Sequence, residues 1–202
     1  MAETLIEETA RRSPTSNAST FRTRKRIQDA FLELAETTNF SDINVKLLTH
    51  AAGLNRTTFY LHYGDVSELA EETMATLIDE LDVGGKLLAQ GMRADDPNWQ
   101  ESFFHAIASR PVLYRRLLAN PESSPLAGRI MALHMRNIKA IWRTYGIAFD
   151  PEDPKWRLRV RFAAGGTYEL SLQWLEDDMN MLPEVICAHC LDLILHTAKG
   201  LD

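Results

Sequence analysis

The sequence predicts an all-α fold, with a small helical domain at the N-terminus followed by a larger helical domain. Between Ile27 and Ala35, apolar residues recur with the period of about 3.6 that marks an amphipathic helix. A capping side chain directly before proline, which is typical of helix starts, occurs at Asp96-Pro97, Ser124-Pro125 and Asp153-Pro154. No segment alternates apolar and polar residues over a useful length, so strands are not expected.

These signals place the helices in order along the chain. They are expected at residues 21–38, 45–52, 56–62, 66–90, 97–109, 111–119, 125–145, 154–178 and 183–199. The basic run Arg22–Arg26 would then occupy the first turns of a helix, where the helix dipole disfavours positive charge, which hints at another role for that charge. Gly84-Gly85 indicates a kink in the 66–90 helix, or a break without function. Residues 1–20 are polar and are expected to form a flexible arm.

The composition is typical of a globular protein and not of a membrane-spanning or disulfide-rich one. The chain has 202 residues, of which 45% are hydrophobic and 25% charged, as in ordinary globular domains. No apolar run approaches the roughly 18–20 residues that span a bilayer, and the N-terminus lacks the signal-peptide pattern. Two cysteines, Cys187 and Cys190, are too few for a disulfide framework and lack a second pair of metal ligands. We therefore expect a cytoplasmic protein with no metal and no cofactor.

Positive charge is concentrated near the N-terminus. Residues 9–64 contain 8 basic and 4 acidic residues, a balance of +4, whereas residues 65–202 contain 14 basic and 21 acidic residues, a balance of −7. A basic N-terminal unit on an acidic body would direct a polyanion to one end of the chain. Taken alone, this charge distribution equally fits two ordinary solvated faces.

Residues 44–63 have the outline of a helix-turn-helix. Two short helices are separated by the turn Gly53–Asn55, in which the glycine can adopt the left-handed conformation that a sharp turn requires. An asparagine stands before each helix, where its side chain can cap the first turn. Phe59 and Tyr63, four residues apart, can anchor one side of the second helix in the core and leave its N-terminal end free to meet DNA bases. A tight helical hairpin whose aromatic residues simply pack remains the alternative.

The segment RTRKRIQDAFLELAETTNFSDINVKLLTHAAGLNRTTFYLHYGDVSEL, within residues 21–69, resembles the DNA-binding domain of TetR-family transcriptional regulators. That family has a basic first helix, a Phe/Gly-type loop and a two-helix unit of the form IA-x-x-AG-V-S-x-x-T-hydrophobic-Y-x-H/Y-F, which here reads LLTHAAGLNRTTFYLHY. Three positions depart from the family pattern. Asn55 replaces a serine, Leu48 replaces a small alanine, and Val66 stands where a lysine often reaches phosphate.

The resemblance implies that double-stranded DNA is the partner of residues 21–66. Arg56, Thr57 and Thr58 would face bases, while residues around them would face the DNA backbone. The complete set of expected DNA-binding residues is Arg22, Arg24, Lys25, Asn44, Lys46, Asn55, Arg56, Thr57, Thr58, Tyr60 and His62.

The resemblance also implies that residues 67–202 bind an effector and form a homodimer. A glycine-containing helix, a Trp-Leu-Glu sequence, a turn marked by proline and a last apolar helix resemble the C-terminal part of one subgroup of the family. The expected dimer-interface residues are Gly165, Leu172, Trp174, Leu175, Ile186, Cys190, Leu193 and Ile194. A hairpin that packs only within its own chain is the alternative.

Aromatic residues and methionines occur on the helices that enclose a ligand cavity in members of the TetR family. The residues considered for contact with a small apolar or amphipathic effector are Trp99, Phe103, Phe104, Met131, His134, Met135, Trp142 and Tyr168. Such residues at helical spacing also fit an ordinary core, and nothing in the sequence identifies a ligand.

These inferences together predict a transcriptional regulator that binds an inverted-repeat operator as a dimer and is released by a ligand. A repressor is the default that the resemblance implies, and an activator of the same fold is the alternative. HExxH, GxSxG and dinucleotide-binding patterns do not occur, so an enzyme is not expected. The rival from a different class is a ligand- or protein-binding helical module without DNA binding.

Overall fold

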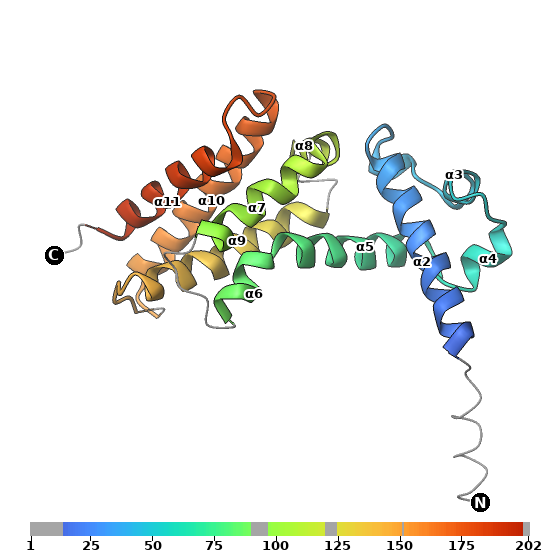
Figure 1. The fold of residues 1–202 in the computed structure, drawn as a ribbon, viewed down its shortest axis with the longest axis horizontal. Helices are drawn as coiled ribbons and strands as arrows, with labels where there is room; N and C mark the ends of the chain where they lie inside the picture. The colour runs from blue at the N-terminus through green and yellow to red at the C-terminus, as the bar shows by residue number, and fades with distance from the viewer. Residues whose placement is uncertain (1–13, 90–96, 120–124, 151, 200–202) are drawn as a thin grey trace, which may run out of the picture. The chain divides into compact units, whose positions relative to one another are not determined.

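A computed structural model describes residues 14–89, 97–119, 125–150 and 152–199. All regular secondary structure in these ranges is helical, as the sequence predicts (Figure 1). The chain divides into two compact units, Met1–Thr73 and Met74–Asp202, and the division falls inside α5 (Val66–Leu81). Among the described helices, none combines the length and the apolar character needed to cross a lipid bilayer.

The first unit contains three helices that precede α5. They are α2 (Pro14–Ala35), α3 (Val45–Ala51) and α4 (Arg56–Tyr60), and the short 3-10 helix η1 (Phe40–Asp42) lies between α2 and α3. Helix α3 packs against both α2 and α4. The fully or almost fully buried side chains of this unit include Ile27, Phe31, Leu48, Phe59, Tyr63 and Leu69. Leu48, which departs from the family pattern, is therefore accommodated in the core.

Helix α2 begins earlier than the sequence indicated. It starts at Pro14 rather than near residue 21, so the expected arm of residues 1–20 is wrong from Pro14 onward, and residues 1–13 lie outside the described ranges. Proline fits the first turn of a helix because its missing N–H has no helical partner there. The basic run Arg22–Arg26 consequently lies inside the helix and not in its first turn. The helix dipole therefore does not disfavour positive charge there, contrary to the expectation from the sequence.

The single helix expected over residues 66–90 is interrupted. Helix α5 ends at Leu81 and α6 (Val83–Ala89) follows, so the break lies at Asp82 and the glycine pair sits inside α6. One carboxylate oxygen of Asp82 pairs with Arg136 at 2.7 Å. A Cβ on Gly85 would lie 2.9 Å from Asn137 Oδ1 and closer still to Asp82. A side chain at this position would therefore require the side chains of Asp82 and Asn137 to move.

The second unit continues from α6 with α7 (Pro97–Ser109), α8 (Pro111–Ala119), α9 (Pro125–Thr144), α10 (Pro154–Glu176) and α11 (Pro183–Ala198). Helix α10 packs against α8, α9 and α11, and α7 packs against α6 and α11. Trp142 is fully buried in this unit, and its indole N–H donates to the Ile194 carbonyl at 3.1 Å.

Local signals explain why these later helices begin and end close to their predicted positions. Asp153 caps α10 by accepting a hydrogen bond from the Lys155 amide at 2.8 Å. Gly146, with φ of +69°, follows the last turn of α9 in the left-handed conformation. The other two predicted caps, Asp96 and Ser124, lie outside the described residues.

Two glycine substitutions test the turn between α3 and α4. Gly53 has φ of +59°, so Gly53→Ala should lower the free energy of unfolding by about 1–2 kcal/mol. Gly128 lies on the exposed side of α9, and an added methyl group there would have no atom within 4 Å. Gly128→Ala should therefore raise the free energy of unfolding by about 0.5–1 kcal/mol. Urea unfolding followed by circular dichroism measures both changes. Equal effects of the two substitutions would contradict the assigned turn.

Candidate functional site

The helix-turn-helix is held by side-chain caps at both helices. The side-chain oxygen of Asn44 accepts from two backbone amides in the first turn of α3, at 3.1 and 3.2 Å. The side-chain oxygen of Asn55 accepts from the Thr58 amide at 2.7 Å and from the Thr58 hydroxyl at 2.9 Å. These bonds confirm the predicted caps. They also engage the Thr58 hydroxyl within the chain, so only its remaining lone pairs and its methyl group are free for a base.

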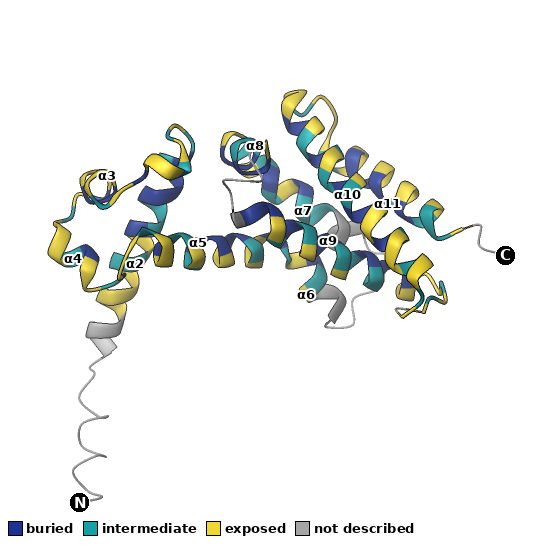
Figure 2. Cartoon of the chain, turned by 180° about the vertical axis from the view of Figure 1, so that it is seen from behind, coloured by how far each residue is buried: buried dark blue, intermediate teal, exposed yellow. Residues whose placement is uncertain are grey.

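Helix α4 has one anchored side and one exposed side. Phe59 and Tyr63 are buried, with their ring centroids 5.9 Å apart. Arg56, Thr57 and Tyr60 are exposed, and 57% of the Tyr60 surface is accessible. Figure 2 shows that α3 and α4 carry mostly exposed positions. The anchoring residues therefore lie where the sequence predicted, and the expected base-reading residues are accessible at the N-terminal end of α4.

Arg24 is engaged inside the first unit. Its Nη1 donates to the His62 carbonyl at 2.9 Å, its Nε donates to Glu72 Oε1 at 3.2 Å, and its Nη2 donates to the other oxygen of Glu72. The guanidinium also lies 4.5 Å from the centre of the Tyr63 ring. The hydrogen bond to Glu72 is the main cause that raises the pKa of Arg24. Arg24 therefore takes part in the internal structure of this unit, and its expected contact with DNA stays a prediction.

The Glu72 carboxylate accepts hydrogen bonds from different parts of the first unit. Besides Arg24, it accepts from Gln28 Nε2 at 2.9 Å and from the Tyr63 hydroxyl at 3.3 Å. Burial first, and then the charge of Glu72, raise the pKa of Tyr63 to about 12, so the hydroxyl keeps its proton and can donate it. This Glu72 network links α2, the residues after α4, and α5. Sequence reasoning missed Glu72 and Gln28 because nothing local connects residues so far apart in the chain.

The remaining basic residues of the first unit stay accessible. Lys25 forms only an exposed pair with Asp29 at 3.2 Å, which is worth little in water, and Arg22 bonds its own helix at the Ala18 carbonyl. Arg26, which was not in the expected set, borders the same surface groove of about 410 Å³ together with Arg22 and Lys25. Lys46 is exposed on α3 and His62 is partly buried.

The second unit contains a partly open cavity of about 70 Å³. Its lining is mostly apolar, and three expected ligand residues belong to it, namely Phe103, Phe104 and His134. His134 is 5% exposed, and its Nε2 has no hydrogen-bond partner among the described residues. Burial lowers the pKa of His134 to about 4, so the imidazole is neutral at neutral pH. The lining residues that sequence reasoning missed are Leu81, Gly84, Ser102, Asn137, Ile138, Ile141, Thr167, Cys187, Leu191 and, from the expected interface set, Cys190 and Ile194.

Four other expected ligand residues do not line this cavity. Met131 and Met135 pack against the apolar cluster around Trp142, and Trp142 itself bonds Ile194 in that core. The Tyr168 hydroxyl donates to the Leu118 carbonyl at 2.8 Å. The side chains of these four residues are used in packing, and their contact with a ligand stays a prediction. Trp99 lies outside the residues whose side chains are described.

Some of the expected dimer residues are accessible on the surface of the chain, and others are buried in its core. Gly165 and Leu172 are partly buried, and 52% of the Leu193 surface is exposed. The others are packed into the core of their own chain, and their place in an interface stays a prediction; they are Trp174, Leu175, Ile186, Cys190 and Ile194. The outward apolar residues of α10 were missed: Leu158 is 69% exposed and Phe162 is 74% exposed. Phe162 and Leu193 border an apolar groove of about 380 Å³ between α10 and α11.

The chain is similar to known proteins in its three-dimensional structure. No protein-family model and no curated protein matches it. A TetR transcriptional regulator from Streptococcus agalactiae 2603V superposes with a TM-score of 0.68 at 18% identity, over 89% of this chain and 97% of that one. The dihydroxyacetone kinase operon activator DhaS gives 0.63 at 14% identity, over 88% and 96%. The chain has the TetR-family fold.

A third solved structure is also similar to this chain. The TetR-family repressor FadR of Thermus thermophilus, solved in complex with lauroyl-CoA, gives a TM-score of 0.54 at 19% identity, over 89% of this chain and 96% of that one. In each case the similarity covers most of both chains. The predicted fold is thereby confirmed from the first unit through the second.

The buried imidazole makes stability depend on pH. Between about pH 6.5 and 4, the unfolded chain binds a proton at His134 that the folded chain does not. The free energy of unfolding should therefore fall by about 1.4 kcal/mol for each pH unit of acidification in this window. In His134→Gln the free energy of unfolding, measured by urea unfolding at a series of pH values, should lack this decrease. His196→Asn, an exposed control, should keep it, and an unchanged profile in His134→Gln would contradict the burial of a neutral imidazole.

Proposed function

We propose that the chain is a sequence-specific DNA-binding transcriptional regulator that acts as a homodimer on an inverted-repeat operator. The observation that carries this proposal is the construction of α4, a short capped helix held by Phe59 and Tyr63 on one side. Its accessible N-terminal end presents Arg56 and Thr57, and arginine at this place in a helix-turn-helix can bond guanine with two hydrogen bonds.

Phosphate contacts would come from the exposed basic residues of the first unit. Lys46 lies in the first turn of α3, and Arg22, Lys25 and Arg26 border one groove along α2. Contacts of this kind position a protein on the duplex without reading its sequence, and each neutralised phosphate adds about −0.9 to the slope of log affinity against log salt. We therefore expect steep salt dependence on every duplex, added to sequence preference through α4.

The proposed dimer interface is the outer face of α10 and α11. Leu158, Phe162 and Leu193 are large apolar side chains with more than half of their surface exposed. A second copy of the same face, related by a two-fold axis, would remove this surface from water and place two copies of α4 on two half-sites. Such burial is favourable by about 25 cal/mol for each Å² of apolar surface.

The cavity in the second unit supports control by a ligand. Its volume of about 70 Å³ and apolar lining suit a small molecule with one polar group placed against His134. Such a ligand would regulate DNA binding only if it bound one state more tightly, and a full switch needs about 5.5 kcal/mol of differential binding. We take repression as the default, with activation as the alternative, since the structural neighbours include an activator and a repressor.

The same cavity favours a second candidate function. A ligand-binding helical module that has lost DNA affinity would keep the pocket and the buried His134, whose Nε2 has no partner among the described residues. It would have no need of the exposed Arg56 or of the basic groove on α2. Binding to DNA with sequence preference separates the two candidates.

Two substitutions distinguish base reading from phosphate contact. Arg56→Ala should weaken binding to a preferred duplex by about 1–3 kcal/mol and change binding to a scrambled duplex much less. Lys46→Ala should weaken binding to both duplexes alike and reduce the salt slope by about one unit. Fluorescence anisotropy titrations at several salt concentrations measure both effects. An equal loss on the two duplexes in Arg56→Ala would exclude base readout by this residue.

The interface proposal has a matched control on another helix. Phe162→Glu should place a charge in the apolar face of α10 and convert the dimer to monomers. Val112→Glu introduces the same charge at a valine of α8 that is 51% exposed, and it should leave the dimer intact. Sedimentation equilibrium on both variants gives the oligomeric state. A dimer that survives Phe162→Glu would place the interface elsewhere.

A further inference from the structure

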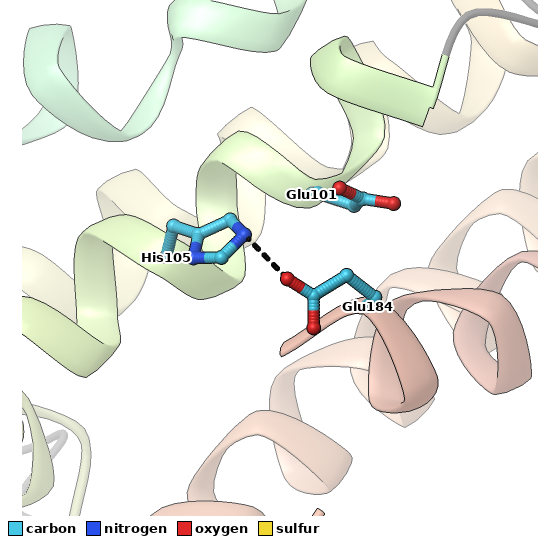
Figure 3. A group of neighbouring side chains, drawn as sticks. All are labelled: Glu101, His105 and Glu184. Carbon is cyan, nitrogen blue, oxygen red and sulfur yellow. Dashed lines mark ion pairs between the residues drawn. The ribbon is translucent and has the colours of Figure 1, made fainter. Parts of the chain in front are cut away.

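Three side chains with metal-ligating atoms converge on the surface of the second unit. Glu101 and His105 lie one helical turn apart on α7, and Glu184 lies in the first turn of α11 (Figure 3). One carboxylate oxygen from each glutamate and one ring nitrogen of His105 lie within 4.8 Å of one another. Figure 3 shows the imidazole directed toward Glu184, with Glu101 beside them. The spacing of Glu101 and His105 is visible in the sequence, but their partner Glu184 is distant along the chain.

We propose that Glu101, His105 and Glu184 bind a divalent transition-metal ion. One imidazole and two carboxylates suit zinc and its neighbours, and three protein ligands leave a position for water. Metal–ligand distances of about 2.0–2.2 Å place neighbouring ligands of a tetrahedral ion about 3.3–3.6 Å apart. His105 Nε2 and Glu184 Oε1, 3.1 Å apart, already have nearly this spacing. Glu101 is partly exposed, so a change in its side-chain torsions can close the remaining distance.

An ordinary ion pair accounts for only part of this cluster. The contact between His105 and Glu184 requires one carboxylate, whereas Glu101 brings a second negative charge to the same place. Among the described side chains, no lysine or arginine pairs with either glutamate. Two carboxylates so close together repel each other, and a bound dication would convert this repulsion into attraction for both.

The proposed metal site adjoins the cavity in the second unit. Ser102, Phe103 and Phe104 line the cavity and lie between Glu101 and His105 on α7. Cys187, which also lines it, follows Glu184 by one turn of α11, and the charges of both glutamates add to burial in raising the pKa of its thiol to about 12. A metal ion would therefore fix two walls of the cavity against each other. This inference does not depend on DNA binding.

Calorimetric titration of the metal-stripped full chain with Zn²⁺ tests the site. We expect saturable binding with one strong site per chain and a rise in the melting temperature. Glu101→Gln leaves the His105–Glu184 pair in place, yet it should lower the affinity about tenfold or more, as should His105→Asn. His196→Asn removes another exposed His–carboxylate pair of the second unit, with Asp192 on α11, and should bind Zn²⁺ like the unmodified chain.

Several outcomes would overturn the proposal. Absence of saturable binding would do so, as would equal affinity in Glu101→Gln and the unmodified chain. Titration with Co²⁺ gives an independent signature, because thiolate ligands produce a near-ultraviolet charge-transfer band that imidazole and carboxylates do not. Such a band would assign the ion to Cys187 and Cys190 instead. Far-ultraviolet circular dichroism of each variant verifies that the helices remain folded, since all three proposed ligands lie at the surface.

Discussion

The first unit depends on one carboxylate. Glu72 accepts hydrogen bonds from Arg24, Gln28 and Tyr63, and in this way it connects α2 and α5 with the chain that leaves α4. A helix as short as α4 is not stable alone, because nucleation of a helical turn is unfavourable. Its position is fixed instead by its burial through Phe59 and by the network that holds Tyr63. The proposed reading surface on α4 thus rests on the burial of Phe59 and Tyr63 together with this network.

The parts of the fold that the sequence could predict are those set by local signals. The turn at Gly53, the asparagine caps and the proline starts each act within a few residues, and the corresponding helices begin and end close to the expected places. The glycine pair indicated a kink or a break in this helix, but the place of the break, at Asp82, could not be predicted in this way. The helical pattern continues through it, and the contacts found there are tertiary: Arg136 pairs with Asp82, and a Cβ on Gly85 would lie 2.9 Å from Asn137 Oδ1.

In the candidate sites, too, residues placed by local spacing were predictable and residues placed by distant contacts were not. Residues on α4 were predictable because cap, anchor and exposed positions follow from helical spacing. The role of Arg24 was not, because its partner Glu72 lies far along the chain, on α5. On α10 and α11 the periodicity reveals apolar residues without telling which stripe faces the core. The hairpin buries Trp174 and Ile194 against its neighbours and leaves Phe162 exposed. The cavity walls likewise come from helices that meet only in the folded chain.

Selection of binding sites from random duplexes, with the purified full chain at two salt concentrations, tests the proposed DNA reading most directly. A dimer that reads bases through α4 should enrich an inverted repeat at both concentrations, with the affinity falling as salt rises. Weak binding that disappears with salt and enriches no sequence would contradict the proposed function. That result would leave a helical protein that binds a ligand or a partner through its second unit.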